Sequence, residues 1–280
     1  MSQVEIGVNL EFIRSSEKSF REGLRTAARL GYKYVEPCVS TGYDLLALAG
    51  YYHMVCMDDD PLEIKEWMDE LDLKPSAVSA HSPLMRPEVA IPYLTKAIRF
   101  ASDIGAPVIT TDEGIKPDWM TDEEAFQIMG YTIRQVMRTA ERYGIALGLE
   151  PHSKYTSRRD TFIRILELSD SPCWKVNWDP GNFYLGAQDD VYETFDAVAD
   201  RLCHMHGKDI SINQSQSERG QVTGTPVGCA CGEGVIDWQR ILDICRKHHV
   251  SPVISVECGT VEQADRSLKY LKELVAKQPV

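Results

Sequence analysis

Four residues with metal-binding side chains stand at the ends of short apolar segments. They are Glu150 in Leu-Gly-Leu-Glu-Pro-His, Asp179 in Val-Asn-Trp-Asp-Pro-Gly-Asn, His206 in His-Met-His-Gly-Lys-Asp and Glu257 in Val-Ile-Ser-Val-Glu. If folding brings them together, their carboxylates repel one another unless a cation lies between them. Three oxygen ligands and one nitrogen ligand suit Mn²⁺, Mg²⁺, Co²⁺ or Zn²⁺. The residue types predict one divalent metal ion; the alternative is four separate, solvated strand ends.

The imidazole ligand has two candidates in one segment, His204 and His206. Because side chains alternate along a strand, residues two apart point in the same direction. We assign the ligand to His206, which lies nearer the C-terminal end of the strand. His204 is then either a deeper partner of the ligand or a buried, hydrogen-bonded histidine.

These segments need a scaffold that delivers several strand ends to one place. Strand-like runs that are apolar throughout alternate with helical patterns, which predicts parallel strands covered by helices. The expected strands are 4–9, 32–37, 76–80, 106–111, 145–150, 174–179, 202–207 and 252–257. Eight such units predict an α/β fold, a single (β/α)8 TIM barrel over residues 1–280, with its active site at the C-terminal ends of the strands. An open doubly wound sheet is the alternative, although no Gly-x-Gly-x-x-Gly follows the first strand.

Helix-end motifs fall between the expected strands. Gly31, Gly105 and Gly144 each separate a helical pattern from a strand, as left-handed helix caps do. Asp60, followed by proline, predicts a helix start. The Thr-Asp-Glu-Glu run at 121–124 predicts a capping box.

Two connections are longer than the others, at about 40–60 and 209–236. Both follow the C-terminal ends of expected strands, so they would lie on the same face of a barrel. Loops of this length usually form lids or interface segments.

The charge balance limits the partners. Net charge is −12, from 42 acidic and 30 basic residues. Lys and Arg that neutralise phosphates dominate nucleic-acid binding, so an acidic chain without a basic run argues against it. No apolar stretch approaches the roughly 18 residues that span a bilayer. We expect neither a nucleic acid nor a membrane as a partner.

The eight cysteines are scattered, and no secretory signal precedes the first expected strand. We therefore expect free thiols and a cytoplasmic protein. Cys229 and Cys231 are an alternative metal clip, but they lack the usual two-residue spacer and a second pair.

Four motifs resemble the xylose isomerase-like TIM barrel superfamily of sugar phosphate isomerases and epimerases, which includes ketose 3-epimerases and AP endonuclease family 2 relatives. The motifs are Leu-Glu-Pro-His at 149–152, Trp-Asp-Pro-Gly-Asn at 178–182, His-Met-His-Gly-Lys-Asp at 204–209 and Val-Glu at 256–257. His81, in Ala-His-Ser-Pro after the third expected strand, extends the resemblance to essentially the whole chain.

The resemblance implies that Glu150, Asp179, His206 and Glu257 bind one ion, Mn²⁺ before Mg²⁺, Co²⁺ or Zn²⁺. It also implies that Glu150 and Glu257 are acid/base catalysts. The metal would polarise the substrate carbonyl and stabilise the enediolate formed when one glutamate removes the neighbouring proton. The implied substrate is a keto-sugar or an inosose-like polyol ketone. A homodimer or homotetramer is implied by the resemblance alone.

Substrate contacts are expected from His81, His152, Lys208 and Asn182. His152 binds substrate, orients Glu150 or caps the backbone. His81 binds substrate or is structural, and Lys208 binds a hydroxyl or the enediolate, or forms a salt bridge to a nearby acid. Asn182 stands where many relatives have a histidine, which argues against the three-zinc endonuclease and puts the exact substrate contacts in question.

Three functions remain open. The first is a metal-dependent isomerase or epimerase. The second is a lyase on the same scaffold, a dehydratase or deglycosylating eliminase, which would form the same enediolate but expel a leaving group. The third is a non-catalytic sugar-binding protein, and the presence of both Glu150 and Glu257 argues against it. Glu36 and Glu113 also end expected strands and are predicted only to line the site.

Overall fold

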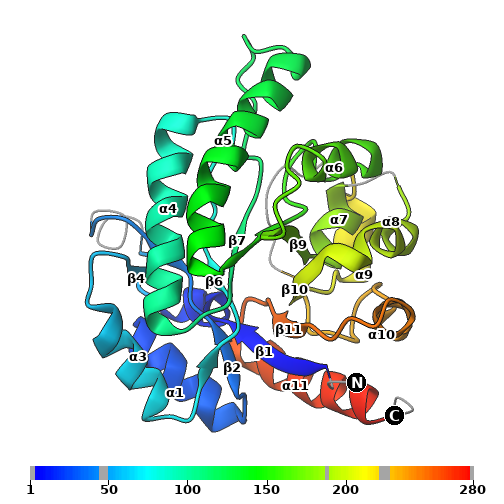
Figure 1. Cartoon of the computed structure of the whole chain (residues 1–280). Coiled ribbons are helices and arrows are strands. Elements are labelled where there is room, and N and C mark those ends of the chain that lie inside the picture. Colours follow the sequence, from blue (N-terminus) through cyan, green and yellow to red (C-terminus); the bar gives the residue numbers. More distant parts are fainter. Residues whose placement is uncertain (1–3, 44–49, 187–188, 221–227, 278–280) are drawn as a thin grey trace.

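The computed structural model describes residues 4–43, 50–186, 189–220 and 228–277. Strands form the centre of the molecule and helices surround them (Figure 1). The strands are β1 (Glu5–Asn9), β2 (Tyr34–Glu36), β3 (Val39–Ser40), β4 (Val55–Cys56), β5 (Lys74–Pro75), β6 (Val78–Ser79), β7 (Val108–Thr111), β8 (Ala146–Leu149), β9 (Trp174–Trp178), β10 (Leu202–Gly207) and β11 (Val253–Val256).

The α-helices are α1 (Phe20–Leu30), α3 (Pro61–Asp69), α4 (Pro87–Ile104), α5 (Asp122–Tyr143), α6 (Arg159–Leu166), α7 (Pro180–Gly186), α8 (Val191–Val198), α9 (Ile212–Glu218), α10 (Trp238–Lys247) and α11 (Val261–Ala276). Two 3-10 helices, η1 (Leu10–Ser16) and η2 (Ala199–Arg201), lie among them.

The main sheet is parallel and has the order β5-β2-β1-β11-β10-β9-β8-β7-β6. Its first and last members, β5 and β6, are separated only by Ser76 and Ala77. The Ser76 N–H donates to the Val35 carbonyl at 2.8 Å, and the Ala80 N–H donates to the Thr110 carbonyl at 3.0 Å. The two short strands are therefore halves of one strand that joins both edges, and the predicted TIM barrel is confirmed.

The strands are apolar because both of their faces are covered. Val8, Val35, Ile109, Leu147 and Val176 are fully buried between the barrel interior and the outer helices. Each such side chain contributes about 1.5–3 kcal/mol through its removal from water. This core fixes the barrel geometry on which the polar strand ends depend.

The predicted helix ends are confirmed. Gly31, Gly105 and Gly144 have φ of 92°, 84° and 66°, the left-handed conformation that favours glycine. Asp60 caps α3 by accepting a backbone N–H at 2.9 Å. Thr121–Glu124 forms the capping box at the start of α5.

Both long connections contain short secondary-structure elements. In the first, β3 and β4 pair as a separate two-stranded parallel sheet; its residues 44–49 lie outside the described residues. The second contains α9 and an antiparallel bridge between Asp209 and Cys229; its residues 221–227 also lie outside the described part of the chain.

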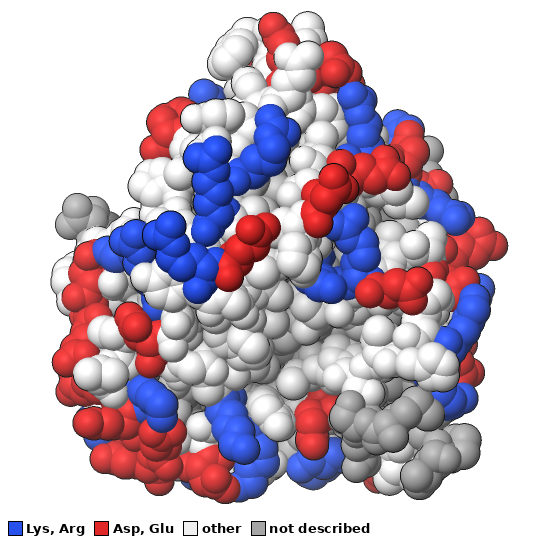
Figure 2. Space-filling model, in the orientation of Figure 1, with Lys and Arg blue, Asp and Glu red and all other residues white. Residues whose placement is uncertain are grey.

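Acidic and basic side chains are interspersed over the face shown in Figure 2. Among the described residues, no helix combines the length and the apolar character needed to cross a membrane.

Asp209 organises the connection that follows β10. Its Oδ1 accepts the N–H groups of Ile210 at 2.9 Å and Ile236 at 3.0 Å. Its Oδ2 accepts the Gly232 N–H at 2.8 Å and the Trp238 Nε1–H at 3.0 Å. The carboxylate is fully buried, and its two oxygens satisfy four donors, of which those of Ile210, Ile236 and Trp238 are in buried hydrogen bonds.

We predict that Asp209→Asn destabilises the fold by about 1–3 kcal/mol, because the amide turns one acceptor into a donor that faces N–H groups. Urea unfolding followed by circular dichroism measures the change. Asp103→Asn, at an exposed position of α4, is the matched control and should unfold like the unaltered protein. Equal midpoints for the two variants would show that the Asp209 hydrogen bonds contribute little.

Candidate metal centre

The structure brings Glu150, Asp179, His206 and Glu257 together at the C-terminal rim of the barrel. They lie at the ends of β8, β9, β10 and β11, four neighbouring strands. Each offers one ligand atom, and these atoms all lie within 4.8 Å of one another. His206 Nδ1 lies 2.9 Å from Glu257 Oε2 and 3.3 Å from Glu150 Oε1. It lies 3.7 Å from Asp179 Oδ2.

This cluster fits a cation because its inward-facing atoms lack other partners. All four residues are buried. His206 Nδ1, Asp179 Oδ2 and Glu257 Oε2 are among the buried polar atoms without a hydrogen-bond partner. Leaving such atoms unpaired is costly, and a shared metal ion would satisfy all three. The residues can therefore hold a metal ion, although the geometry does not choose among the divalent metals.

The electrostatics show how crowded the cluster is. Burial raises the pKa of Asp179 and outweighs the nearby Lys208 ammonium. Burial also opposes ionisation of Glu257, but Lys208 and His206 hold its pKa well below the usual range. Burial lowers the pKa of His206, yet Glu150 and other carboxylates raise it well above its usual value. The surrounding carboxylates thus favour the protonated form of His206, as opposite charges at short range do.

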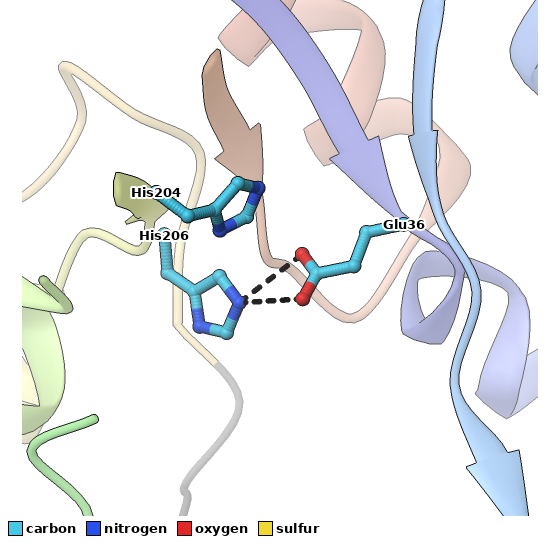
Figure 3. A group of neighbouring side chains, drawn as sticks. All are labelled: Glu36, His204 and His206. Carbon is cyan, nitrogen blue, oxygen red and sulfur yellow. Dashed lines mark hydrogen bonds and ion pairs between the residues drawn. The ribbon is translucent and has the colours of Figure 1, made fainter. Parts of the chain in front are cut away.

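A fifth buried residue, Glu36 at the end of β2, orients the imidazole ligand. Its two carboxylate oxygens lie 3.0 and 3.1 Å from His206 Nε2 (Figure 3). Burial opposes its ionisation, but His206 and His204 lower the pKa of Glu36 to about 2. When Nε2–H donates to Glu36, Nδ1 is left to face the other ligands. Carboxylates commonly fix metal-binding histidines in this way.

His204 lies deeper in the barrel than His206, and Figure 3 shows both rings from the same strand, β10. Its Nδ1 lies 3.0 Å from Asn177 Oδ1 and its Nε2 lies 3.4 Å from Ser76 Oγ. Burial lowers the pKa of His204 to about 4. His204 is therefore a buried, hydrogen-bonded histidine whose surroundings disfavour protonation. Its partner Asn177 also donates to Glu150 Oε2 at 2.8 Å.

Lys208 and Asn182 contact the cluster directly. Lys208 Nζ lies 2.6 Å from Glu257 Oε1 and 3.6 Å from Asp179 Oδ2. It also donates to Asn182 Oδ1 at 3.0 Å, while Asn182 Nδ2 donates to Glu150 Oε1 at 3.1 Å. The predicted substrate contacts Lys208 and Asn182 are thus both buried and hold the two glutamates in place.

The other two predicted substrate contacts are His81, which lies beside Glu150, and His152, which lies beside His81. His81 Nε2 is 3.7 Å from Glu150 Oε2. Both Nδ1 atoms face Asp112 Oδ2, at 2.8 Å from His81 and 3.2 Å from His152. Burial lowers the pKa of His81, but Glu150 and Asp112 outweigh it and raise that pKa to about 9.

The comparison with known sequences agrees with this geometry. The sequence profile described as xylose isomerase-like TIM barrel matches residues 24–274. The chain belongs to this family. Among curated proteins, no sequence matches the chain.

Solved structures share the fold of the xylose isomerase-like barrel. A D-tagatose 3-epimerase-like protein is 19% identical, with 97% of both chains covered and a TM-score of 0.75. The IOLI protein, solved with a binding zinc atom, is 17% identical, with 98% of both chains covered and a TM-score of 0.75. The probable 3-DHS dehydratase AsbF from Bacillus anthracis is 17% identical, with 96% of this chain and 98% of that chain covered and a TM-score of 0.71.

Sequence reasoning undervalued two residues of this barrel. Glu36 was expected only to line the site, but it forms an ion pair with His206. Asp112 was not singled out, although it holds both histidines. Each directly ends or follows a barrel strand, which is the same feature that identified Glu150. That rule, applied to all strands, would have found both.

The alternative metal clip is not formed in the described part of the chain. Cys229 and Cys231 are free thiols. The groups of described residues that could hold a metal contain neither of them. Cys231 instead donates from Sγ to the Gly207 carbonyl at 3.1 Å.

We predict that Glu36→Gln weakens metal binding about 10–100-fold, because the amide loses the charge that fixes the His206 ring. Competition with a fluorescent chelator measures the affinity for Mn²⁺ and Zn²⁺. Glu113→Gln is the matched control, since Glu113 is also a buried glutamate after a strand but accepts from Tyr155 and Thr156. Equal affinities for the two variants would contradict an orienting role for Glu36.

Proposed function

We propose that this protein is a divalent-metal-dependent isomerase or epimerase that acts on a keto-sugar or an inosose-like polyol ketone. One observation supports it above all: two glutamates from different strands, Glu150 and Glu257, share one buried cluster with Asp179 and His206. A site built only to hold sugar has no need for two buried glutamates at its centre. Mn²⁺ is the ion we propose, because carboxylate-rich sites with one imidazole suit it.

Structural neighbours support the reaction class. A D-tagatose 3-epimerase-like protein, an L-ribulose 3-epimerase and a 3-keto-D-glucoside 4-epimerase all share the fold over at least 95% of each chain. Their identities of 19%, 14% and 15% support the scaffold rather than the substrate. Epimerisation beside a carbonyl is thus the proposal, and the particular sugar is left to experiment.

The glutamates supply the proton transfer in this proposal. One carboxylate removes the proton from the carbon next to the carbonyl, and the C–H electron pair forms the enediolate. The other glutamate returns a proton to the opposite face in an epimerase, or to the neighbouring carbon in an isomerase. A divalent ion bound by the cluster would polarise the carbonyl oxygen and the neighbouring hydroxyl.

Lys208 and Asn182 give the two glutamates different hydrogen-bonding partners. Lys208 contacts Glu257 Oε1 at 2.6 Å, which favours the ionised form of Glu257. Asn182 Nδ2 donates to Glu150 Oε1 at 3.1 Å; burial raises the pKa of Glu150, but His206 and His81, rather than Lys208, lower it below its usual value. The two carboxylates therefore have different environments, as residues with different acid/base tasks require.

A lyase is the second candidate, because the probable 3-DHS dehydratase AsbF shares the fold. A lyase would form the same enediolate and then break a bond to a leaving group. The mass of the product separates the two candidates: isomerisation and epimerisation conserve it, and dehydration removes water. The partner is in both cases a small molecule; a homodimer or homotetramer remains a prediction.

We predict that the Mn²⁺-loaded protein exchanges one carbon-bound hydrogen of a ketose with solvent deuterium. D-tagatose, D-fructose, L-ribulose and scyllo-inosose in D₂O are suitable probes, followed by NMR and mass spectrometry. Glu257→Gln should lower the exchange rate at least about 100-fold, because a positioned acid or base contributes this much.

The control for this test is Asp243→Asn, at an exposed position of α10, which should exchange at the rate of the unaltered protein. Metal content is measured on each variant, so that loss of the ion is distinguished from loss of the base. Product lighter by one water would favour the lyase. No exchange and no product with any probe, at full metal loading, would contradict the proposed chemistry.

A further inference from the structure

Three buried side chains connect the interior of the barrel with the candidate metal centre. They are His204 on β10, Asn177 on β9 and Glu150 after β8, three neighbouring strands. His204 Nδ1 lies 3.0 Å from Asn177 Oδ1, and Asn177 Nδ2 donates to Glu150 Oε2 at 2.8 Å. None of the three is more than 1% exposed. Because water hardly reaches these groups, their donors and acceptors have to match one another.

Glu150 accepts a hydrogen bond from an amide on each of its oxygens. Asn177 Nδ2 donates to Oε2, and Asn182 Nδ2 donates to Oε1 at 3.1 Å. A carboxylate that binds a metal ion is ionised, and an ionised carboxylate only accepts hydrogen bonds. Each amide must therefore turn its NH₂ group, and not its carbonyl oxygen, toward Glu150.

The two amides differ in what fixes their orientation. Lys208 only donates, so its Nζ faces Asn182 Oδ1, at 3.0 Å, and the NH₂ group of Asn182 is left for Glu150. Asn177 instead faces an imidazole, whose Nδ1 donates or accepts according to the position of the ring proton. Burial lowers the pKa of His204 to about 4, which favours the neutral ring with a single N–H. The position of that proton thus determines which group Asn177 presents to Glu150.

The geometry favours a proton on Nδ1 of His204. The contact of Nδ1 with Asn177 is 3.0 Å long, whereas Nε2 lies 3.4 Å from Ser76 Oγ. With the proton on Nε2, Nδ1 would accept from the NH₂ group of Asn177. The carbonyl oxygen of that amide would then face the Glu150 carboxylate, and the two oxygens would repel each other.

Packing between β8 and β9 restricts Asn177 further. A Cβ atom at Gly148 would lie only 2.9 Å from Asn177 Cβ. Gly148 is two residues before Glu150, so the strand that ends at the glutamate approaches the backbone of Asn177 closely. Because close-packed segments have little room to shift, the main freedom left to Asn177 is the direction in which its amide faces.

We propose that His204 is a positioning residue that acts through Asn177: its Nδ1–H binds the Asn177 carbonyl, and the Asn177 NH₂ group in turn orients the Glu150 carboxylate. This inference rests on the proposed function, in which Glu150 is an acid/base group, and deepens it by adding a residue that acts from the barrel interior. One strand, β10, then supplies both the imidazole ligand His206 and the imidazole that supports a second ligand (Figure 3).

The first test determines the position of the His204 proton in the unaltered protein. Long-range ¹H–¹⁵N NMR on ¹⁵N-labelled protein reports which ring nitrogen bears the proton, and Zn²⁺ is loaded because Mn²⁺ is paramagnetic. Assignment from the backbone to the ring identifies the His204 signal without any variant. We expect the proton on Nδ1, and a proton on Nε2 would overturn the inference.

The second test is a double-mutant cycle on metal affinity, measured by competition with a fluorescent chelator. His204→Gln should weaken Mn²⁺ binding about tenfold, as loss of support for a ligand does. The His204→Gln/Asn177→Ala double variant should bind no more weakly than Asn177→Ala alone, because both changes remove the same support. Additive losses, or an unchanged affinity in His204→Gln, would show that His204 does not act through Asn177.

Two further variants separate the hydrogen bond from the packing of the ring. His204→Asn keeps an N–H donor at the δ position, whereas His204→Gln moves it to the ε position, and both lose the ring. His204→Asn should therefore bind Mn²⁺ more tightly than His204→Gln, and equal losses would overturn the inference. His53→Gln is the matched control, since His53 is also a buried histidine, and it should bind Mn²⁺ like the unaltered protein.

These measurements do not require turnover, so they separate this inference from the proposed function. If a ketose exchanges its hydrogen with solvent, His204→Gln should lower the exchange rate at full metal loading, and His204→Asn should restore part of it. Absence of exchange with every ketose would refute the proposed function. The ring proton and the metal affinities would still decide whether His204 orients Glu150 through Asn177.

Discussion

The structure depends on the burial of four carboxylates around one point. Glu36, Glu150, Asp179 and Glu257 are all nearly inaccessible to water. Their cationic neighbours are His206, Lys208 and, at the edge of the cluster, His81. Charges in a low-dielectric interior interact strongly, so an excess of carboxylates over cations is destabilising unless an additional positive charge is bound. A divalent ion is the simplest group that meets this requirement and also uses the unpaired atoms of the cluster.

The barrel makes this burial feasible because its strands bring polar ends to one rim while their sides remain apolar. The candidate metal ligands lie at the ends of β8 to β11, and His81 and His152 follow β6 and β8. Glu150 lies where the two sets meet. The rim therefore has a highly charged part next to a part that His81, Asp112 and His152 line.

Much of this arrangement could be predicted from the sequence because it depends on local patterns. Apolar strands, glycine caps and a capping box each depend on a few neighbouring residues, and the structure has them at the predicted positions. Strand ends also identified Glu150 and Glu257, since strand direction places both on one rim. Their catalytic roles stay predictions.

The contacts between side chains could not be predicted in the same way. The pairs Glu36–His206 and Asp112–His81 join segments that are 170 and 31 residues apart. Such contacts depend on which strands become neighbours and on the rotamer of each side chain. No periodicity in the sequence encodes them. The split of the third strand into β5 and β6 has the same origin, because each half pairs with a different neighbour.

Metal content, measured by inductively coupled plasma mass spectrometry, tests the central claim most directly. The unaltered protein should hold about one equivalent of a divalent metal after supplementation, because the four ligand atoms lie within 4.8 Å of one another. The Glu150→Gln/Asp179→Asn double variant should lose it, and the surface double variant Asp103→Asn/Asp243→Asn should keep it. An unaltered protein that binds no metal at any supplementation, while remaining folded, would contradict the four-ligand centre and the chemistry proposed from it.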